Sequence, residues 1–251
     1  MFPILFQYKL ITIGGYGVSL ALGFYLSFLL MEREFKLRNI NPDLAYKILL
    51  VIIPAGVAGS KIFHILEHLD EFFADPLGML FSGAGMTAYG GYIISFLLVI
   101  FVIRKNKENI LNVFDAASPP MALGYCFGRF GCHVAGDGCY GLETLSFWAT
   151  AYPNGIVPTT MTVYPTPLFE VFFSFIAVWI LLIMRKRELA PGRLFSTFLI
   201  LSGLPRFLVE FIRLNPKMLL GFTQAQIIGI IFFIAGVSGW IYFGKKNQRI
   251  A

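Results

Sequence analysis

Charged residues are scarce in this chain: they make up 14% of its 251 residues, while 57% are apolar. An average soluble domain is about 25% charged, so an ordinary soluble globular protein is excluded. Cysteine is also scarce, with three residues and no C-x-x-C pair, so we expect neither a disulfide scaffold nor a structural zinc site. The net charge is +6, but Lys and Arg form short clusters between long apolar runs. We therefore expect a membrane protein and no nucleic-acid partner.

Long apolar runs divide the sequence. A helix needs about 20 mostly apolar residues to cross about 30 Å of hydrocarbon. Stretches of about that length with at most two charges occur at 10–31, 44–66, 86–103, 116–134, 166–184, 194–212 and 218–244. These stretches predict an all-α integral membrane protein, with seven transmembrane helices in a single polytopic domain over residues 1–251.

Basic residues are divided unevenly between the connections. Of the 20 Lys and Arg residues, 14 flank the first, third and fifth connections or follow the last helix, whereas residues 135–164 contain none. Basic residues are retained on the cytoplasmic side of a membrane. We therefore expect the N-terminus outside and the C-terminus in the cytoplasm.

Apart from Lys47, which is counted with the first connection, three Lys and Arg residues lie inside predicted spans: Lys61, Arg129 and Arg206. Such a residue costs about 2.5 to 3.5 kcal/mol on insertion scales, which makes it a candidate functional residue. The expected topology puts all three in the outer half of the bilayer. Helices that run the other way begin in the same layer with further polar side chains, namely Tyr16, Tyr89 and Glu170. We expect these six side chains to converge on an anionic phospholipid head group.

Two of these residues also have simpler interpretations. Lys61 is close enough to the outer interface to extend its amine to water and do nothing else. Arg206 and Glu210 are four residues apart, so they could be an ion pair that only makes the span insertable. Arg129 has no acidic residue three or four positions away.

The densest motif is GRFGCHVAGDGCYG, residues 128–141, which contains five glycines. Glycine allows close backbone approach to a ligand and is costly inside a helix. Arg129 beside these glycines is suited to bind a phosphodiester, because a guanidinium offers a charged fork of donors. Glycine spacing alone is weak evidence, since membrane helices also pack through small residues.

This motif resembles the signature of the prolipoprotein diacylglyceryl transferase family, GR(x)GNF(x)NGE. Other segments resemble further motifs of that family in order and spacing: 15–17, 59–61, 74–76, 85–91, 164–170 and 206–213. The resemblance implies transfer of a diacylglyceryl group from phosphatidylglycerol to the lipobox cysteine of a prolipoprotein signal peptide. Glycerol phosphate leaves, and no cofactor or metal is required. It also implies the bacterial cytoplasmic (inner) membrane, with the active site facing the outer leaflet.

The resemblance and the polar positions together give the candidate site. Catalytic roles are assigned to Arg129, Arg206, Tyr89, His133 and Asp137. Substrate-binding roles are assigned to Tyr16, Lys61, Gly90, Gly91, Gly128, Gly131, Gly141, Glu170, Glu210 and Arg213. Arg129 and Arg206 would neutralise the leaving phosphate. Glu170 and Glu210 would orient these two arginines.

The chain departs from the family pattern at polar positions. Tyr89 and Tyr164 replace histidines, Cys132 and Ala135 replace asparagines, and Asp137 replaces a glutamate. The base that would deprotonate the acceptor thiol is therefore open. His133 is one hypothesis, and it could equally be a helix-end residue facing head groups. Tyr89 could instead act as a donor, with an arginine lowering the thiol pKa directly.

Further alternatives receive less support. Cys132 and Cys139 could form a disulfide or remain separate thiols, and with Cys126 and His133 they lack the tight spacing of a metal set. His64 and His68 are four residues apart, which suits either a metal or a polar helix end. A relative with a different acceptor, or without catalysis, stays an alternative function. A transporter would be expected to have internal repeats and broken helices at the bilayer midplane. The sequence shows neither a repeat nor a polar track that reaches the cytoplasmic side.

Overall fold

The structure, a computed structural model, describes residues 2–8, 11–81, 87–218 and 221–248. It divides into two compact units. Unit 1 comprises Met1–Met31 and Phe114–Ala251, and unit 2 comprises Glu32–Val113. A single polytopic domain stays a prediction.

Helices account for most of the described residues. The long ones in the described ranges are α1 (Gly15–Leu37), α2 (Asp43–Glu67), α5 (Ala88–Lys105), α6 (Ile110–Ala135), α7 (Thr166–Met184), α8 (Arg193–Val209) and α9 (Gln224–Gln248). Among described residues, five helices are long and apolar enough to cross a membrane: α1, α2, α7, α8 extended to Ile212, and α9 as far as Lys245. The chain is therefore a multi-pass membrane protein. That α5 and α6 also cross, and which way the helices run, stay predictions.

The core of unit 1 lies between α6, α7 and α8. Buried apolar side chains from the three helices pack together there, including Ala122, Leu181 and Phe198. Asp115 in the second turn of α6 accepts hydrogen bonds from the backbone N–H groups of Gly192 (2.8 Å) and Phe195 (2.7 Å). Because the first N–H groups of a helix have no partner within it, this buried carboxylate caps the start of α8.

Glycines let the helices of unit 1 approach closely. A Cβ on Gly203 of α8 would come within 2.5 Å of the carbonyl oxygen of Gly229 in α9. A Cβ on Gly23 of α1 would come within 2.7 Å of Phe127 in α6. Close packing at small residues of this kind is common where membrane helices associate.

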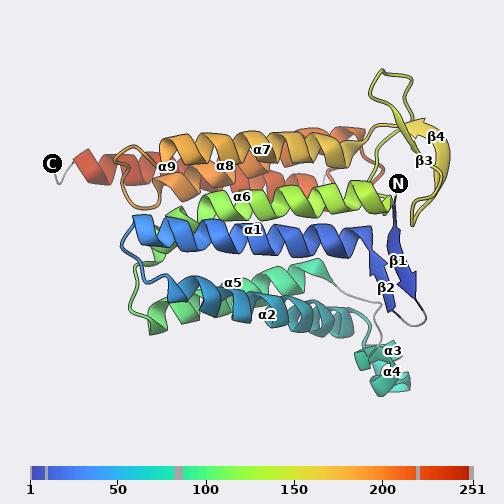
Figure 1. Cartoon of the computed structure of the whole chain (residues 1–251), viewed down its shortest axis with the longest axis horizontal. Coiled ribbons are helices and arrows are strands. Elements are labelled where there is room, and N and C mark those ends of the chain that lie inside the picture. The colour runs from blue at the N-terminus through green and yellow to red at the C-terminus, as the bar shows by residue number, and fades with distance from the viewer. Residues whose placement is uncertain (1, 9–10, 82–86, 219–220, 249–251) are drawn as a thin grey trace. The chain divides into compact units, whose positions relative to one another are not determined.

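Two antiparallel hairpins, which the sequence did not predict, accompany the helices. One pairs β1 (Ile4–Tyr8) with β2 (Ile11–Gly14), and the other pairs β3 (Thr150–Tyr152) with β4 (Thr159–Val163). Figure 1 shows β3 and β4 beyond the end of α6. Position 10, the predicted start of the first span, lies outside the described residues, and the helix itself begins at Gly15 because residues 11–14 pair as a strand.

The last helix also starts later than predicted. It begins at Gln224, not at residue 218, because Met218 donates its N–H to the carbonyl oxygen of Phe222 and Lys217 pairs with Thr223 in an isolated β-bridge. The side chain of Gln226 then accepts from the backbone N–H of Thr223 and closes the start of α9. Helix α6, in contrast, begins six residues before the predicted span, at Ile110, where Asn109 accepts the N–H groups of Leu111 and Asn112.

Unit 2 is built on the pair α2 and α5, which lie side by side in Figure 1. Gly59 and Gly90 face each other, since a Cβ on either would come within 2.5 Å of the other's carbonyl oxygen. Two short helices, α3 (Leu69–Ala74) and α4 (Pro76–Phe81), follow α2. Residues 85 and 86 of the family-like segment 85–91 lie outside the described residues.

Candidate active site

Glu170 lies at the centre of a group of charged side chains in unit 1. It stands in the second turn of α7, and its side chain is 2% exposed. Its Oε1 accepts hydrogen bonds from Nη1 of Arg206 at 2.6 Å and from the hydroxyl of Tyr125 at 2.8 Å. Its Oε2 lies 3.3 Å from Nε of Arg129 and 3.7 Å from Nη1 of Arg213. One buried carboxylate therefore holds three arginines together.

Glu210 is the second carboxylate of this group. Its Oε2 lies 3.6 Å from Nη2 of Arg206 and 3.8 Å from Nη1 of Arg213. Its Oε1 accepts hydrogen bonds from the Thr223 hydroxyl at 3.0 Å and from the side-chain amide of Asn215. The ion pair between Arg206 and Glu210 is thus present, but as part of a larger network. We call Arg129, Glu170, Arg206, Glu210 and Arg213 the arginine cluster.

The chain brings these residues together from three places. Arg129 lies near the end of α6 and Arg206 near the end of α8. After Val209 the backbone tightens into a 3-10 turn, η1 (Glu210–Ile212), and Arg213 follows it directly. Because side chains three residues apart eclipse in a 3-10 turn, Arg213 and Glu210 end on the same side.

The arginine cluster carries a net charge of +1, from three guanidinium and two carboxylate groups. Three of its buried atoms have no hydrogen bond in the described structure, namely Oε2 of Glu170, Oε2 of Glu210 and Nη1 of Arg213. Nη1 of Arg213 forms ion pairs with both of these carboxylate oxygens, at 3.7 and 3.8 Å, but at a distance too long for a hydrogen bond. The excess of guanidinium donors favours an anion.

The loop after α6 places a thiol beside this cluster. Gly136 and Gly138 have positive φ angles, +60° and +87°, which turn the chain back sharply. Cys139 then donates its N–H to Oδ1 of Asp137, and its Sγ accepts a hydrogen bond from Nη1 of Arg129 at 3.9 Å. The ligand atoms of Cys132, Asp137 and Cys139 lie within 4.8 Å of one another, and the cysteines are free thiols.

This environment activates the thiol of Cys139. A hydrogen bond with the Cys132 thiol, aided by the charges of Arg213 and Arg129, lowers the pKa of Cys139 to about 7. Burial and the charge of Asp137 act in the opposite direction and do not outweigh these effects. A large share of Cys139 is therefore thiolate at neutral pH.

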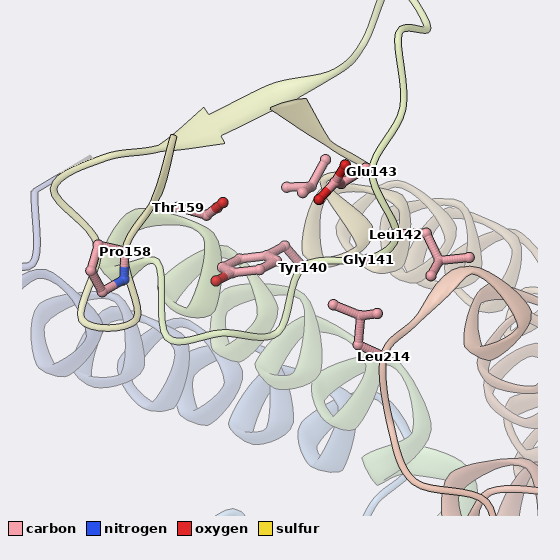
Figure 2. Close-up of a pocket in the computed structure, with 8 residues that line it drawn as sticks. Tyr140, Gly141, Leu142, Glu143, Pro158, Thr159 and Leu214 are labelled. Atoms are coloured by element: carbon pink, nitrogen blue, oxygen red, sulfur yellow. The ribbon is translucent and has the colours of Figure 1, made fainter. Parts of the chain in front are cut away.

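A pocket adjoins the backbone of Arg213. Gly141 pairs with Arg213 in an isolated β-bridge, and a Cβ on Gly141 would come within 2.2 Å of the carbonyl oxygen of Ile212. Only glycine fits there. Beside this bridge lies a pocket of about 640 Å³, and Figure 2 shows Tyr140, Thr159 and Leu214 among its lining residues.

His133 belongs to a different contact. Its Nδ1 lies 3.0 Å from the hydroxyl of Tyr152, and the two rings meet edge to face. Tyr152 is buried and also stacks on Tyr140. Burial, chiefly, raises the pKa of Tyr152, so its hydroxyl stays protonated. A role of His133 as base stays a prediction.

Other predicted site residues of unit 1 pack near the cluster's helices. Tyr16 in α1 lies against Gly131, where an added Cβ would be 3.1 Å from its ring. Gly128 faces open space, since an added Cβ would meet no atom of the described residues within 4 Å. The open surface at Gly128 leaves room for a ligand beside Arg129.

Four predicted site residues belong to unit 2, and their convergence with the arginine cluster stays a prediction. Lys61 is buried in α2, and Tyr89 is half-buried at the start of α5. Gly90 and Gly91 contact α2, where a Cβ would meet Gly59 or Ser60 within 2.5 Å. The structure thus gives these two glycines a packing role. Their part in substrate binding is a prediction.

Comparison with known proteins identifies the family. The family model described as prolipoprotein diacylglyceryl transferase matches residues 3–242. The chain belongs to the prolipoprotein diacylglyceryl transferase family.

Several relatives match over nearly their whole length. Proteins named phosphatidylglycerol--prolipoprotein diacylglyceryl transferase come from Leptospira interrogans, with 28% identity over 92% of this chain and 90% of the relative, and from Clostridium tetani, with 29% identity over 94% and 96%. A Clostridium perfringens protein, phosphatidylglycerol--prolipoprotein diacylglyceryl transferase 2, is 31% identical over 90% of each chain. The family resemblance seen in the sequence is thus confirmed.

Sequence reasoning missed four residues that the structure places in or beside the arginine cluster. Tyr125 donates to Glu170 and accepts from Nε of Arg129, four residues later on the same helix, so helical spacing could have indicated it. Cys139 was considered only for a disulfide or a metal. Asn215 and Thr223 come from the irregular segment before α9, and no sequence pattern connects them to Glu210.

Proposed function

We propose that this protein transfers the diacylglyceryl group of phosphatidylglycerol to the cysteine thiol of a prolipoprotein signal peptide. Family membership supports a transferase, and the relatives carry this activity in their names. The observation that carries the proposal for the site is the arginine cluster, in which Glu170 holds three guanidinium groups together.

The proposed reaction is a displacement at carbon. The acceptor sulfur forms a bond to the terminal glyceryl carbon of the lipid, and the bond from that carbon to the phosphate oxygen breaks with its electron pair. The thiol proton passes to a base, and glycerol phosphate leaves. The phosphate changes from a diester with one negative charge to a monoester with two, so negative charge develops on the leaving group.

The arginine cluster is suited to stabilise that charge. Donors already in place around a developing negative charge are commonly the largest contribution to catalysis. Glu170 and Glu210 keep Arg129, Arg206 and Arg213 from repelling one another before lipid binds, because each carboxylate lies between at least two of them. A phosphate that enters would accept from the guanidinium donors that these carboxylates leave free.

The acceptor thiol would meet a positive environment in the same place. A thiol becomes a nucleophile when a nearby cation or base favours its thiolate. We assign this activation to Arg129, with Asp137 ordering the loop that carries Cys139. His133 and Tyr89 stay candidates for the proton acceptor or donor. Tyr16, Lys61, Gly90, Gly91, Gly128, Gly131 and Gly141 are proposed to shape the lipid and peptide sites.

The proposed orientation of the protein in the membrane follows from the sequence. The protein would lie in the bacterial cytoplasmic (inner) membrane with seven spans and the N-terminus outside. Arg129 and Arg206 would then lie in the outer half of the bilayer, where phosphatidylglycerol of the outer leaflet and the signal peptide could both reach them. The distribution of basic residues supports this orientation.

A transfer assay with the purified protein tests the proposal. The protein is mixed with phosphatidylglycerol and a lipobox peptide, and the peptide mass is measured. We expect the peptide to gain one diacylglyceryl group and glycerol phosphate to appear in equal amount. A peptide with serine in place of the lipobox cysteine serves as the control and should stay unmodified.

A second candidate function has some support from the sequence. Tyr89 and Cys132 replace a histidine and an asparagine of the family pattern, so the acceptor could differ. In the same assay, glycerol phosphate release without a modified peptide would favour another acceptor. Neither product under any condition would contradict the transferase proposal.

A further inference from the structure

A cluster of potential metal ligands lies at the end of α2, in unit 2. The chain there reads His64-Ile-Leu-Glu67-His68. Each of His64, Glu67 and His68 offers a ligand atom within 4.8 Å of the other two. The two imidazole rings are 4.4 Å apart between centroids and tilted by 38°. Nothing in the proposed transfer reaction uses these residues.

The backbone explains how the two histidines meet. Residues four apart on a helix lie on the same face. Helix α2 ends at Glu67, and His68 leaves it with φ −132° and ψ 51°. Both rings therefore stand at the last turn, half-buried, with the exposed Glu67 beside them.

Two hydrogen bonds hold the side chains of His68 and Glu67 in the way that metal ligands are usually held. The His68 ring donates from Nδ1 to the carbonyl oxygen of His64 at 3.1 Å, and since a carbonyl can only accept, the lone pair is left on Nε2. Histidine ligands of metals typically make this kind of hydrogen bond through their other nitrogen. The Glu67 carboxylate accepts from the hydroxyl of Thr87, which comes from outside the cluster.

We propose that His64, Glu67 and His68 form a binding site for a zinc ion. Two imidazoles and one carboxylate are a known zinc ligand set, and they suit zinc better than calcium or magnesium, which prefer oxygen alone. Bonds of about 2.1 Å in a tetrahedron place ligand atoms about 3.4 Å apart. The ligand atoms now lie within 4.8 Å of one another, and none of the three side chains is fully buried, so no packed core prevents their χ angles from rotating toward that spacing.

The site is connected to a segment that the transferase proposal uses. Thr87 also donates its backbone N–H to the carbonyl oxygen of Ser60, at 3.0 Å, and stands directly before α5. Tyr89 follows two residues later. Zinc on Glu67 would thus hold the start of α5 against α2. The metal has a positioning role in unit 2 and takes no part in the reaction itself.

Zinc titration of the purified full-length protein tests the site. Because Cys132, Asp137 and Cys139 are a second potential ligand group, a sample with alkylated thiols is titrated in parallel. We expect one zinc equivalent to remain after alkylation. His64→Ala and His68→Ala should each raise the half-saturating zinc concentration of that equivalent by at least about tenfold. Asp70→Asn, an exposed acidic neighbour on α3 outside the group, should leave it unchanged.

Thermal unfolding gives an independent readout. Zinc should raise the Tm of the wild-type protein, and magnesium should not, because a ligand that binds only the folded state stabilises it. His64→Ala should unfold at the wild-type temperature without metal and lose the zinc-dependent increase. Zinc binding that is equally tight in His64→Ala and His68→Ala, or that disappears entirely on alkylation, would overturn the proposal. The transfer activity is not used as the readout, so failure here leaves the transferase proposal untouched.

Discussion

Replacing Glu170 with glutamine is expected to destabilise the protein strongly. The substitution preserves the size of the side chain and removes its negative charge. Oε1 of Glu170 accepts from Arg206 and Tyr125, and Oε2 lies within 3.7 Å of both other arginines of the cluster. Glutamine would leave three guanidinium groups around a neutral amide, while Glu210 would still pair with Arg206 and Arg213.

The size of the expected stability loss follows from the burial of Glu170. Removing one partner of a buried ion pair costs about 3 to 5 kcal/mol, because the other charge stays buried without compensation. The Glu170 side chain is 2% exposed, whereas that of Arg206 is 21% exposed, so water can relieve part of the penalty. We expect a loss near the lower end, about 3 kcal/mol, which corresponds to a Tm decrease of about 6 to 12 °C for a chain of this size.

The assay is thermal unfolding of the purified protein in detergent. Glu188→Gln, which changes an exposed glutamate in the connection before α8, is the matched control and should stay within about 1 °C of wild type. Replacing Arg206 with glutamine in the Glu170→Gln background should recover part of the loss, since one uncompensated charge disappears. A Glu170→Gln protein that unfolds at the control temperature would refute the assignment of Glu170 as the residue that holds the arginines together.

Three further predictions concern other parts of unit 1. Alkylation of Cys139 should accelerate as the pH rises and reach half its maximal rate near pH 7, because its lowered pKa makes it a thiolate above that value. Cys139→Ala serves as the blank. A midpoint near pH 8.5, the ordinary value for a thiol, would contradict this prediction. Gly141→Ala should destabilise the protein by more than about 2 kcal/mol, because the added Cβ meets a backbone carbonyl oxygen. Gly128→Ala should fold normally and lose activity only if lipid approaches there. Equal Tm values for the two variants would count against the packing argument. Asp115→Ala should cost about 2 kcal/mol through loss of the cap on α8, measured by denaturation, and an unchanged midpoint would show that the cap contributes nothing.

Much of the helical pattern could be predicted from apolar run lengths. The predicted and observed bounds of α7 are the same, and those of α2 differ by one residue at each end. Hydropathy alone could not locate the start of α1. Residues 11–14 continue the apolar run, but they form strand β2 and not the first turn of the helix. The start of α9 was missed because the preceding sequence is apolar, although Met218 bonds to Phe222 and Lys217 pairs with Thr223 before the helix begins.

The candidate site was predictable where a charged residue lies inside an apolar span, because burying an unpaired charge there costs free energy. Arg129, Arg206 and Glu170 lie inside apolar spans, so each needs a partner, and the structure pairs them with one another. The contribution of Cys139 was not predictable, since its contact with Arg129 depends on the fold of a loop with two left-handed glycines. The contact between His133 and Tyr152 depends on the β3–β4 hairpin, which no periodicity indicated.

The claim that Arg129 acts in the chemical step, on the leaving phosphate and on the acceptor thiol, is tested most directly by single-turnover transfer. Wild type, Arg129→Ala and the exposed control Arg33→Ala are compared at saturating phosphatidylglycerol, so that the rate reports the chemical step. We expect Arg129→Ala to slow thioether formation by at least about 100-fold, the loss typical of removing one donor to a developing charge. Arg33→Ala should react at the wild-type rate. An Arg129→Ala rate equal to wild type would contradict the account.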